Sequence, residues 1–194
     1  LNDQVVWVAY DITDRKAAEA AIQKRDSILK ATARANHKLL TTTDSNRAIE
    51  LALHEIGTAL NVERAYIFEI SGSQGEAYHS CRARFEWLQD ESLPSVLRHR
   101  SWQGIIFEDF FPGWHERLTG FGIIRVEGFN QNRLLPIQYR ELNSQSLLVI
   151  PMWIDDELYG FFAVDYCSLE HQWNEGEIDA VRVLASSISG LILI

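Results

Sequence analysis

Two short apolar runs stand next to one another in the last third of the chain. Residues 147–154 are continuously apolar and rich in β-branched side chains, and residues 158–164 repeat this character after Asp155 and Asp156. Such runs are typical of buried strands, and a short acidic connection between them favours a tight turn. The pattern therefore predicts an antiparallel hairpin whose strands are buried in a sheet.

A helical pattern follows this hairpin. Asn174 precedes Glu177 by three residues, which is the spacing of a capping box at a helix N-terminus. The apolar residues after it recur every three or four positions, at Ile178, Val181, Leu184, Ala185, Ile188 and Ile192. We therefore expect a helix over residues 175–193 with one face on the sheet.

Upstream, a shorter helix and a second hairpin are predicted. Residues 45–60 carry apolar side chains at helical spacing, and the apolar segment 64–70 begins almost at once after them. A loop of Gly, Ser and Gln separates 64–70 from 76–88, where apolar and polar residues alternate. The alternation places one set of side chains on an inward face: His79, Cys81, Ala83, Phe85 and Trp87.

A long helix is predicted for residues 15–40, which contain no Pro or Gly and are dense in good helix formers. Positions at the three-and-four spacing of a coiled coil run along it, with polar residues among them: Ala18, Ile22, Arg25, Leu29, Thr32, Asn36 and Leu39. Two interpretations follow from this interrupted seam. The helix is either a solvated linker or one strand of a parallel dimer.

Charge and cysteine content narrow the class of protein. The 194 residues carry a net charge of −9 and no run of Lys or Arg. This balance argues against a nucleic-acid partner and against an anionic membrane surface. The two cysteines are too few for a disulfide scaffold, which favours a reducing compartment. No apolar run reaches the ~20 residues of a membrane span, so we expect a cytoplasmic protein.

Few residues invite a catalytic interpretation. His54 lies in a segment that superficially resembles the phosphoacceptor box of histidine kinases, but its short helix leads straight into a strand, so we expect it to be silent. His79 and Cys81 share a strand face, yet two ligands do not complete a tetrahedral site, and no metal site is expected. Motifs typical of hydrolases, metalloproteases and phosphate-binding loops are missing from the sequence. The chain is therefore expected not to be an enzyme.

Two segments resemble a known family. Residues 146–188 resemble the final two strands and last helix of bacterial GAF domains, through Val149-Ile150-Pro151, Tyr159-Gly160-Phe161, Asp165-Tyr166-Cys167 and Gln172-Trp173. Residues 53–68 resemble that family's first domain helix and first strand. The resemblance implies an α+β fold, with a GAF-like antiparallel sheet of five to six strands, helices on both faces and a long N-terminal linker helix. The last helix and helix 45–60 are then expected on one face, and the variable region 91–145 on the other.

The N-terminal residues resemble a second family. Asp11, Ile12 and Thr13 match the motif with which PAS domains end before a signalling helix. The expected division is a C-terminal PAS strand and tail at 1–14, a helical linker at 15–44 and a GAF domain at 45–194. A PAS domain upstream and an output domain downstream, in a parent protein such as a histidine kinase, are implied partners within the chain.

The family resemblance also implies a function and a pocket. It implies a non-catalytic sensory or signal-relay domain of a bacterial two-component protein, which binds a small molecule and transmits its state through the terminal helices. Asp165 occupies the position where bilin-binding relatives place a histidine that points at the pigment. The candidate pocket residues are Phe85, Trp87, Trp102, Trp114, Phe161, Ala163 and Asp165.

The ligand itself is not specified by the sequence. Residues 91–145 contain no cysteine, so covalent bilin attachment at the family's usual position is not expected. A buried Asp165 needs a donor, and Arg125, Arg133, a backbone N–H or a ligand are the candidates. In the contrasting interpretation, the aromatic side chains fill the space themselves and Asp165 only caps a loop.

The alternative function is a ligand-free dimerisation and helix-coupling scaffold. A homodimer is expected in either case, because the last helix has more apolar surface than one face needs. The residues assigned to the dimer and coupling helices are Ile22, Leu29, Leu39, Leu184 and Leu191.

Overall fold

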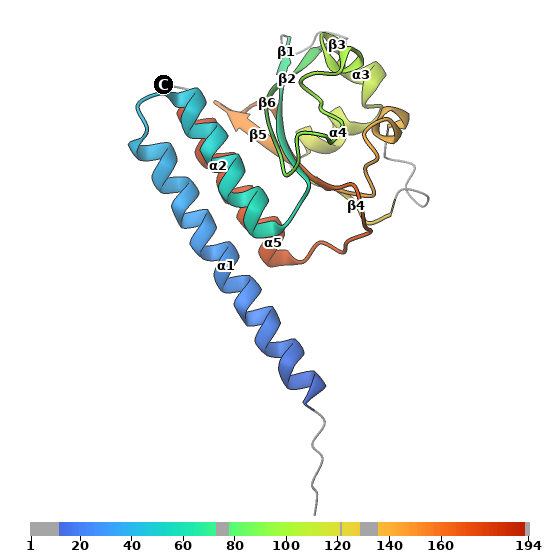
Figure 1. The fold of residues 1–194 in the computed structure, drawn as a ribbon. Coiled ribbons are helices and arrows are strands. Elements are labelled where there is room, and N and C mark those ends of the chain that lie inside the picture. Colours follow the sequence, from blue (N-terminus) through green and yellow to red (C-terminus); the bar gives the residue numbers. More distant parts are fainter. Residues whose placement is uncertain (1–11, 73–77, 121, 129–135, 193–194) are drawn as a thin grey trace, which may run out of the picture.

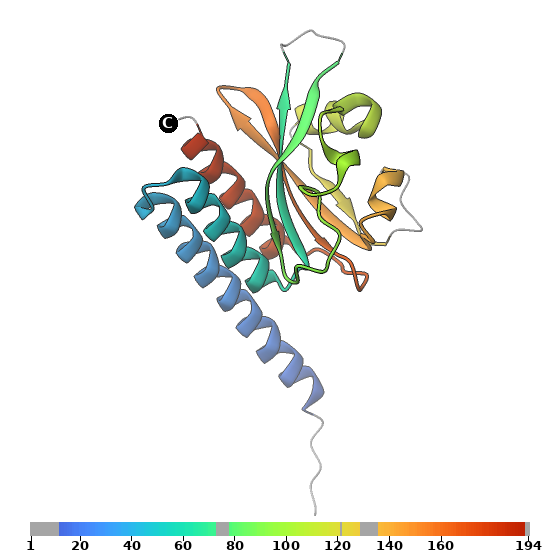
Figure 2. The ribbon, with the colours of Figure 1, turned by 45° about the horizontal axis from the view of Figure 1, so that its top comes forward.

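The computed structural model describes residues 12–72, 78–120, 122–128 and 136–192, and their arrangement is shown in Figure 1. Three long helices lie together on one side of a sheet, and two short helices with their connections cover the other side (Figures 1 and 2). The long helices are α1 (Thr13–Thr41), α2 (Ser45–Leu60) and α5 (Glu175–Ile192), and the short ones are α3 (Phe107–Phe110) and α4 (Trp114–Thr119). The predicted α+β architecture is confirmed.

Six strands form one antiparallel sheet in the order β3-β2-β1-β6-β5-β4. Their bounds are β1 (Arg64–Ser71), β2 (Ser80–Leu88), β3 (Ile105–Ile106), β4 (Ile124–Val126), β5 (Ser146–Ile154) and β6 (Glu157–Tyr166). Both predicted hairpins are present, β1–β2 and β5–β6, and they pair through β1 and β6 at the centre of the sheet. In the described parts of the connections there are two 3₁₀ turns, Arg100–Trp102 and Ile137–Arg140.

Local signals explain why these elements form where they do. In the β5–β6 turn, Asp155 and Asp156 both have positive φ, at 48° and 64°. This matches the hairpin turns whose twist suits antiparallel strands, and Asp tolerates this region better than most residues. At the start of α5, Asn174 Oδ1 accepts a hydrogen bond from Glu177 N, and Glu177 Oε2 accepts one from Asn174 N, each at 3.1 Å. The predicted capping box is therefore confirmed.

A β-bulge in the β1–β2 pair changes which face the side chains of β2 occupy. Ile67 pairs with Phe85, but the next residue, Phe68, pairs with Ala83. The extra residue breaks the simple alternation of side chains along the strand. Ala83 packs on the side of α3 and α4, whereas Phe85 and Trp87 pack on the side of the long helices. The expectation that Phe85 and Trp87 line a pocket beside Asp165 is therefore wrong.

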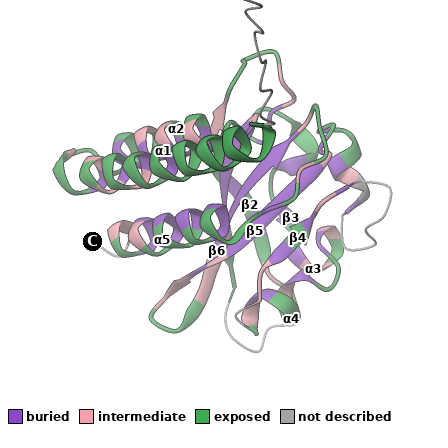
Figure 3. Cartoon of the chain, turned by 90° about the horizontal axis from the view of Figure 1, so that it is seen from below, coloured by how far each residue is buried: buried purple, intermediate pink, exposed green. Residues whose placement is uncertain are grey.

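The linker helix α1 has two different halves. In its second half, Ile28, Ala31, Ala35 and Leu39 are buried against α2 and α5. Every residue from 12 to 27 is exposed, and this part of α1 extends past the ends of the other two long helices (Figures 1 and 3). The helix is thus docked along one half and exposed along the other.

The expected PAS tail and the expected lack of a membrane span can be compared with the described residues only. The strand assigned to a PAS tail, within 1–14, lies almost wholly outside them. No helix in the described part of the chain combines the length and the apolar character that crossing a bilayer requires.

Candidate functional site

Asp165 is fully buried near the end of β6, where it is the cross-strand partner of Arg64 at the start of β1. The guanidinium binds both carboxylate oxygens, with Arg64 Nε 3.0 Å from Oδ1 and Nη2 2.6 Å from Oδ2. Ser144 Oγ also donates to Oδ2, at 2.5 Å. A two-pronged Arg–carboxylate contact of this kind is among the stronger polar interactions in proteins. Asp165 is therefore satisfied by the protein itself.

Of the two arginines predicted as donors for Asp165, only Arg125 lies among the described residues, and no contact between it and Asp165 is seen there. Arg125 instead forms an ion pair with Glu127, its Nη2 lying 2.9 Å from Glu127 Oε1. Arg133 lies outside the described residues. The actual partner, Arg64, is 101 positions away in the sequence and begins a strand, where no local pattern marks it as an ion-pair residue.

Arg64 also fastens the variable region to the sheet. Its Nη1 donates to the carbonyl oxygen of Pro94 at 2.6 Å, and its Nη2 donates to that of Leu142 at 3.1 Å. Burial alone would lower the pKa of the guanidinium, but the charge of Asp165 and the hydrogen bonds to it outweigh burial and raise it. Arg64 is thus a permanent buried cation that connects β1 and β6 to the two ends of the variable region.

An aromatic core, which we define as Phe68, Trp102, Phe107, Phe111, Trp114, Tyr139 and Phe161, fills the sheet face under α3 and α4. All seven side chains are fully buried. Phe161 stacks on Phe68 with ring centroids 5.0 Å apart, and Trp114 stacks on Phe111 at 4.7 Å. Ala163 lies on the same face. The predicted pocket residues Trp102, Trp114 and Phe161 therefore contact other aromatic rings, four of which the sequence analysis did not single out.

Three buried polar groups lie in or beside this aromatic core: the hydroxyls of Tyr66 and Tyr139 and the indole N–H of Trp102. Tyr66 donates from its hydroxyl to that of Tyr139 at 3.1 Å, and burial raises the pKa of both phenols, so both stay neutral. Trp102 Nε1 is buried without a hydrogen-bond acceptor among the described residues. Because an unpaired buried N–H is costly, the indole of Trp102 marks a point where a further acceptor would stabilise the core.

Neither cysteine has the character of a nucleophile. Cys167 lies beside the ion pair, and burial together with the Asp165 charge raises the pKa of its thiol to about 12. Cys81 is buried in the sheet, and burial with the charges of Glu108 and Glu69 raises the pKa of its thiol as well. Reactive cysteines need a lowered pKa, because the thiolate is the attacking species. Both thiols are therefore protonated at neutral pH.

The residues assigned to dimer and coupling helices separate into two groups. Leu39 and Leu184 are buried in the chain's own core, so their assignment to a contact between chains is wrong. Leu191 is partly buried against the same core. Ile22 and Leu29, in contrast, are 67% and 58% exposed on α1.

Beside these exposed residues, α1 and the start of α5 enclose a groove of about 760 Å³. Its lining, which we call the α1–α5 groove, includes Arg25, Ile28, Leu29, Asp179, Ala180 and Val183. Apolar side chains from both helices thus share one surface with a cation and a carboxylate.

Glu177 links the two terminal helices at one end of this groove. Its side chain has no exposed area, and its Oε1 lies 2.6 Å from Lys24 Nζ of α1. The other carboxylate oxygen contacts His171 Nε2 at 2.9 Å. Burial opposes ionisation of Glu177, but hydrogen bonds from Lys24, His171 and the Asn174 backbone outweigh burial and lower its pKa. The capping residue of α5 is thus also the anchor of α1.

His54 lies on the exposed side of α2, with its ring edge-on to Trp87 at a centroid distance of 5.9 Å. The helix that carries it ends at Leu60, and β1 begins at Arg64. This agrees with the sequence argument that the helix is too short for the hairpin of a phosphoacceptor domain. The chemical silence of His54 stays a prediction.

Comparison with known proteins identifies the family to which this fold belongs. The family model described as the GAF domain matches residues 44–192. The chain is 31% identical over 193 residues to the methanogenesis regulatory histidine kinase FilI of Methanothrix harundinacea (strain 6Ac), a match that covers 97% of this chain and 21% of that protein. The chain therefore spans about a fifth of the length of that relative.

Solved structures show the same fold at low identity. The blue-light absorbing form of the Thermosynechococcus elongatus PixJ GAF domain is 22% identical, with a TM-score of 0.60 over 77% of this chain and 84% of that one. The GAF domain of an Acinetobacter phosphoenolpyruvate-protein phosphotransferase is 12% identical, with a TM-score of 0.63 over 85% and 92%. At these identities the likeness concerns the fold alone.

Proposed function

The chain belongs to the GAF domain family, and from this premise we propose that it relays a signal between α1 and α5 within a histidine-kinase-related sensor protein. One observation carries the proposal: the helix that enters the domain and the helix that ends it touch each other directly, through the buried Glu177 and Lys24. A change in the position of α1 would therefore reach α5 without passing through the sheet. The domain acts in this proposal as a coupling element and not as a catalyst.

The packing of α1 supports this role. Its second half is buried against α2 and α5, so it moves with the domain. The residues of α1 before Lys24 are exposed and can follow a module attached upstream, whereas Lys24 itself is held by Glu177. A helix fixed at one end in this way transmits rotation or tilt along its axis, because its backbone hydrogen bonds keep it stiff.

Insertions into the exposed half of α1 test the relay in the natural full-length protein. Two alanines added after Glu19 turn everything upstream by about 200°, whereas seven turn it by about 700°, which is nearly two full turns. We expect the rate of histidine autophosphorylation to differ from that of the unmodified protein when two residues are inserted and to match it when seven are inserted. Equal activity for both insertions would show that helix phase is not what the domain transmits.

We further propose that a second copy of this chain covers the α1–α5 groove. The groove presents apolar Leu29 and Val183 together with Arg25 and Asp179 of opposite charge. A surface that carries both charges can pair with itself across a two-fold axis, as the commonest dimers do. Sedimentation is expected to show a dimer that Leu29→Glu breaks, while Leu40→Glu, at a position 86% exposed outside the groove, leaves it intact. A monomeric unmodified chain would contradict the dimer but not the relay.

Small-molecule binding in the aromatic core is a second candidate function. It is favoured by Trp102 Nε1, which is buried without an acceptor among the described residues. A ligand with a carbonyl or similar acceptor would satisfy this N–H. Native mass spectrometry of the purified chain is expected to show a bound small molecule that Trp102→Phe releases. A protein of bare chain mass would instead favour the ligand-free scaffold.

A further inference from the structure

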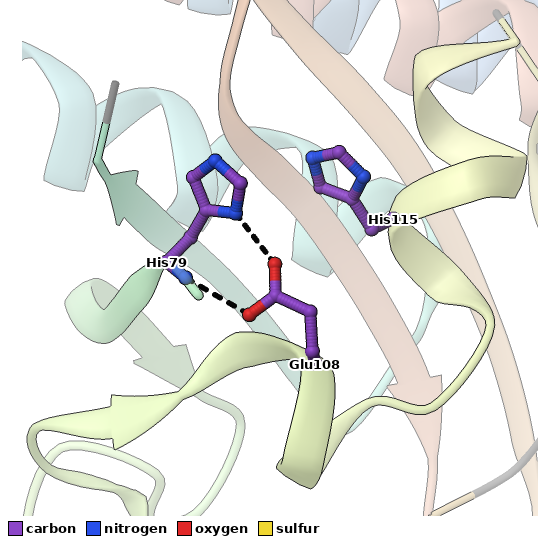
Figure 4. A group of neighbouring side chains, drawn as sticks. All are labelled: His79, Glu108 and His115. Carbon is purple, nitrogen blue, oxygen red and sulfur yellow. Dashed lines mark hydrogen bonds and ion pairs between the residues drawn. The ribbon is translucent and has the colours of Figure 1, made fainter. Parts of the chain in front are cut away.

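Three side chains with metal-binding atoms meet at a point separate from the Arg64–Asp165 pair and from the α1–α5 groove. His79 lies immediately before β2, Glu108 is in α3 and His115 is in α4 (Figure 4). One ligand atom from each residue lies within 4.8 Å of the other two. From the sequence alone, the partner considered for His79 is Cys81 on the same strand. The two residues that the fold brings to His79, Glu108 and His115, come from the variable region.

The carboxylate of Glu108 is held in place by two contacts with His79. Its Oε2 accepts a hydrogen bond from the His79 backbone N–H at 2.9 Å, and its Oε1 lies 2.5 Å from His79 Nδ1. His115 stacks on the ring of His79, with centroids 4.9 Å apart and planes at 15°. Two imidazoles and a carboxylate are thus gathered at one point, with a fixed carboxylate between the two segments (Figure 4).

We propose that His79, Glu108 and His115 bind one divalent transition-metal cation of the Zn²⁺ type. Two imidazole nitrogens and one carboxylate oxygen form a donor set that proteins use for zinc and for non-haem iron. With metal–ligand distances of about 2.1 Å, the ligand atoms of a tetrahedral site lie roughly 3.4 Å apart. An ion would therefore replace the proton between His79 Nδ1 and Glu108 Oε1 and open that 2.5 Å contact, while ligand atoms up to 4.8 Å apart move closer together. Water or an external ligand completes the coordination.

Access and anchoring both suit such a site. The side chains of His79 and Glu108 are 12% and 27% exposed, so an ion reaches them from solvent while they remain held by the fold. Glu108 and His115 belong to α3 and α4, which cover the aromatic core, and His79 directly precedes β2 of the sheet. A bound cation therefore clamps this cover onto the sheet. The site does not depend on the relay or on the dimer proposed above.

Metal titration of the chain without a polyhistidine tag tests the site, with Zn²⁺ followed by calorimetry and Co²⁺ by its visible absorption. We expect one Zn²⁺ per chain and a rise in melting temperature on binding. His115→Phe keeps the ring stack but removes a ligand nitrogen, and it should weaken Zn²⁺ binding at least tenfold. The matched control is His99→Phe, because His99 also lies near a carboxylate, 3.9 Å from Glu141, but no third ligand joins this pair among the residues that the structure describes. This control should bind as the unmodified chain does.

A second variant protects the test against a folding defect. Glu108→Gln keeps the shape of the side chain and an acceptor for the His79 N–H, and it should also weaken Zn²⁺ binding at least tenfold while circular dichroism stays unchanged. The proposal is overturned if the unmodified chain shows no saturable binding up to 100 µM Zn²⁺. A dissociation constant of that size corresponds to a binding free energy of about −5.5 kcal/mol. It is equally overturned if binding persists in both His115→Phe and Glu108→Gln, or if His99→Phe loses it to the same extent.

Discussion

Lys24 and Glu177 are joined by a contact of 2.6 Å between the linker helix α1 and the first turn of α5. The side chain of Glu177 has no exposed area, whereas that of Lys24 is 42% exposed. Glu177 at the same time closes the capping box with Asn174. The start of α5 and the position of α1 therefore depend on the charge of a single side chain.

Removing this charge should change how stability depends on pH. The pKa of Glu177 is lowered in the folded chain, so its stabilising contribution is complete above the usual glutamate pKa of ~4.3 and is lost as pH falls through the lowered value. Glu177→Gln should cost about 1–3 kcal/mol at pH 7. Urea unfolding between pH 7 and 3 should show a smaller loss of stability in this variant. Glu175→Gln, whose side chain is 82% exposed, is the control and should match the unmodified chain.

Asp165→Asn should destabilise the chain strongly, because it leaves the Arg64 cation buried without its counter-charge. Removing one partner of a buried pair typically costs about 3–5 kcal/mol. Chemical denaturation measures this change directly. Asp179→Asn breaks an exposed pair with Arg182 instead and should cost less than about 0.5 kcal/mol. Similar losses in both variants would show that Arg64 does not rely on Asp165.

Phe111→Ala should open a cavity in the aromatic core. Phe111 is fully buried and contacts the rings of Phe68, Trp102 and Trp114. Loss of a buried phenyl ring costs about 3–5 kcal/mol. An apolar cavity of this kind stays dry and accepts small aromatic molecules, so benzene should raise the melting temperature of the variant and not that of the unmodified chain. Tyr78→Ala, at a position 63% exposed, should change stability little.

Gly160 and Gly190 should respond to alanine in opposite directions. A Cβ on Gly160 would lie 1.9 Å from the Phe68 carbonyl oxygen across the β1–β6 pair, and neither central strand can move aside. We expect Gly160→Ala to cost at least about 3 kcal/mol. A Cβ on Gly190 in α5 meets nothing within 4 Å, so Gly190→Ala should gain about 0.5 kcal/mol from helix propensity. Thermal unfolding of the two variants compares them.

The features that the sequence predicted correctly are those set by neighbouring residues. The Asp155-Asp156 turn and the Asn174–Glu177 capping box depend on local backbone preferences, which a reader of the sequence can apply directly. The position of the second hairpin followed from its apolar runs for the same reason. Together with the family resemblance, these signals were sufficient for the four central strands and for the long helices, whereas the edge strands β3 and β4 lie in the region 91–145, which was expected only to cover the sheet.

The features that it missed depend on residues far apart in the chain. The bulge at Arg84, next to Phe85, exists only in the pairing of β1 with β2, so alternation within β2 could not show that Phe85 and Trp87 change face. Arg64 reaches Asp165 only because β1 and β6 are paired. His79 and His115 meet only through the folding of the variable region onto the sheet, and no spacing between them in the sequence indicates this contact.

The half-docked α1 has a mechanical consequence. Residues 13–23 form a stiff arm of about 16 Å beyond the contact of Lys24 with Glu177, at 1.5 Å per residue. A tilt of about 7° around Lys24 would carry the far end of this arm sideways by about 2 Å. The arm thus turns a sideways movement outside the domain into a small rotation of α1 at the point where α1 and α5 meet.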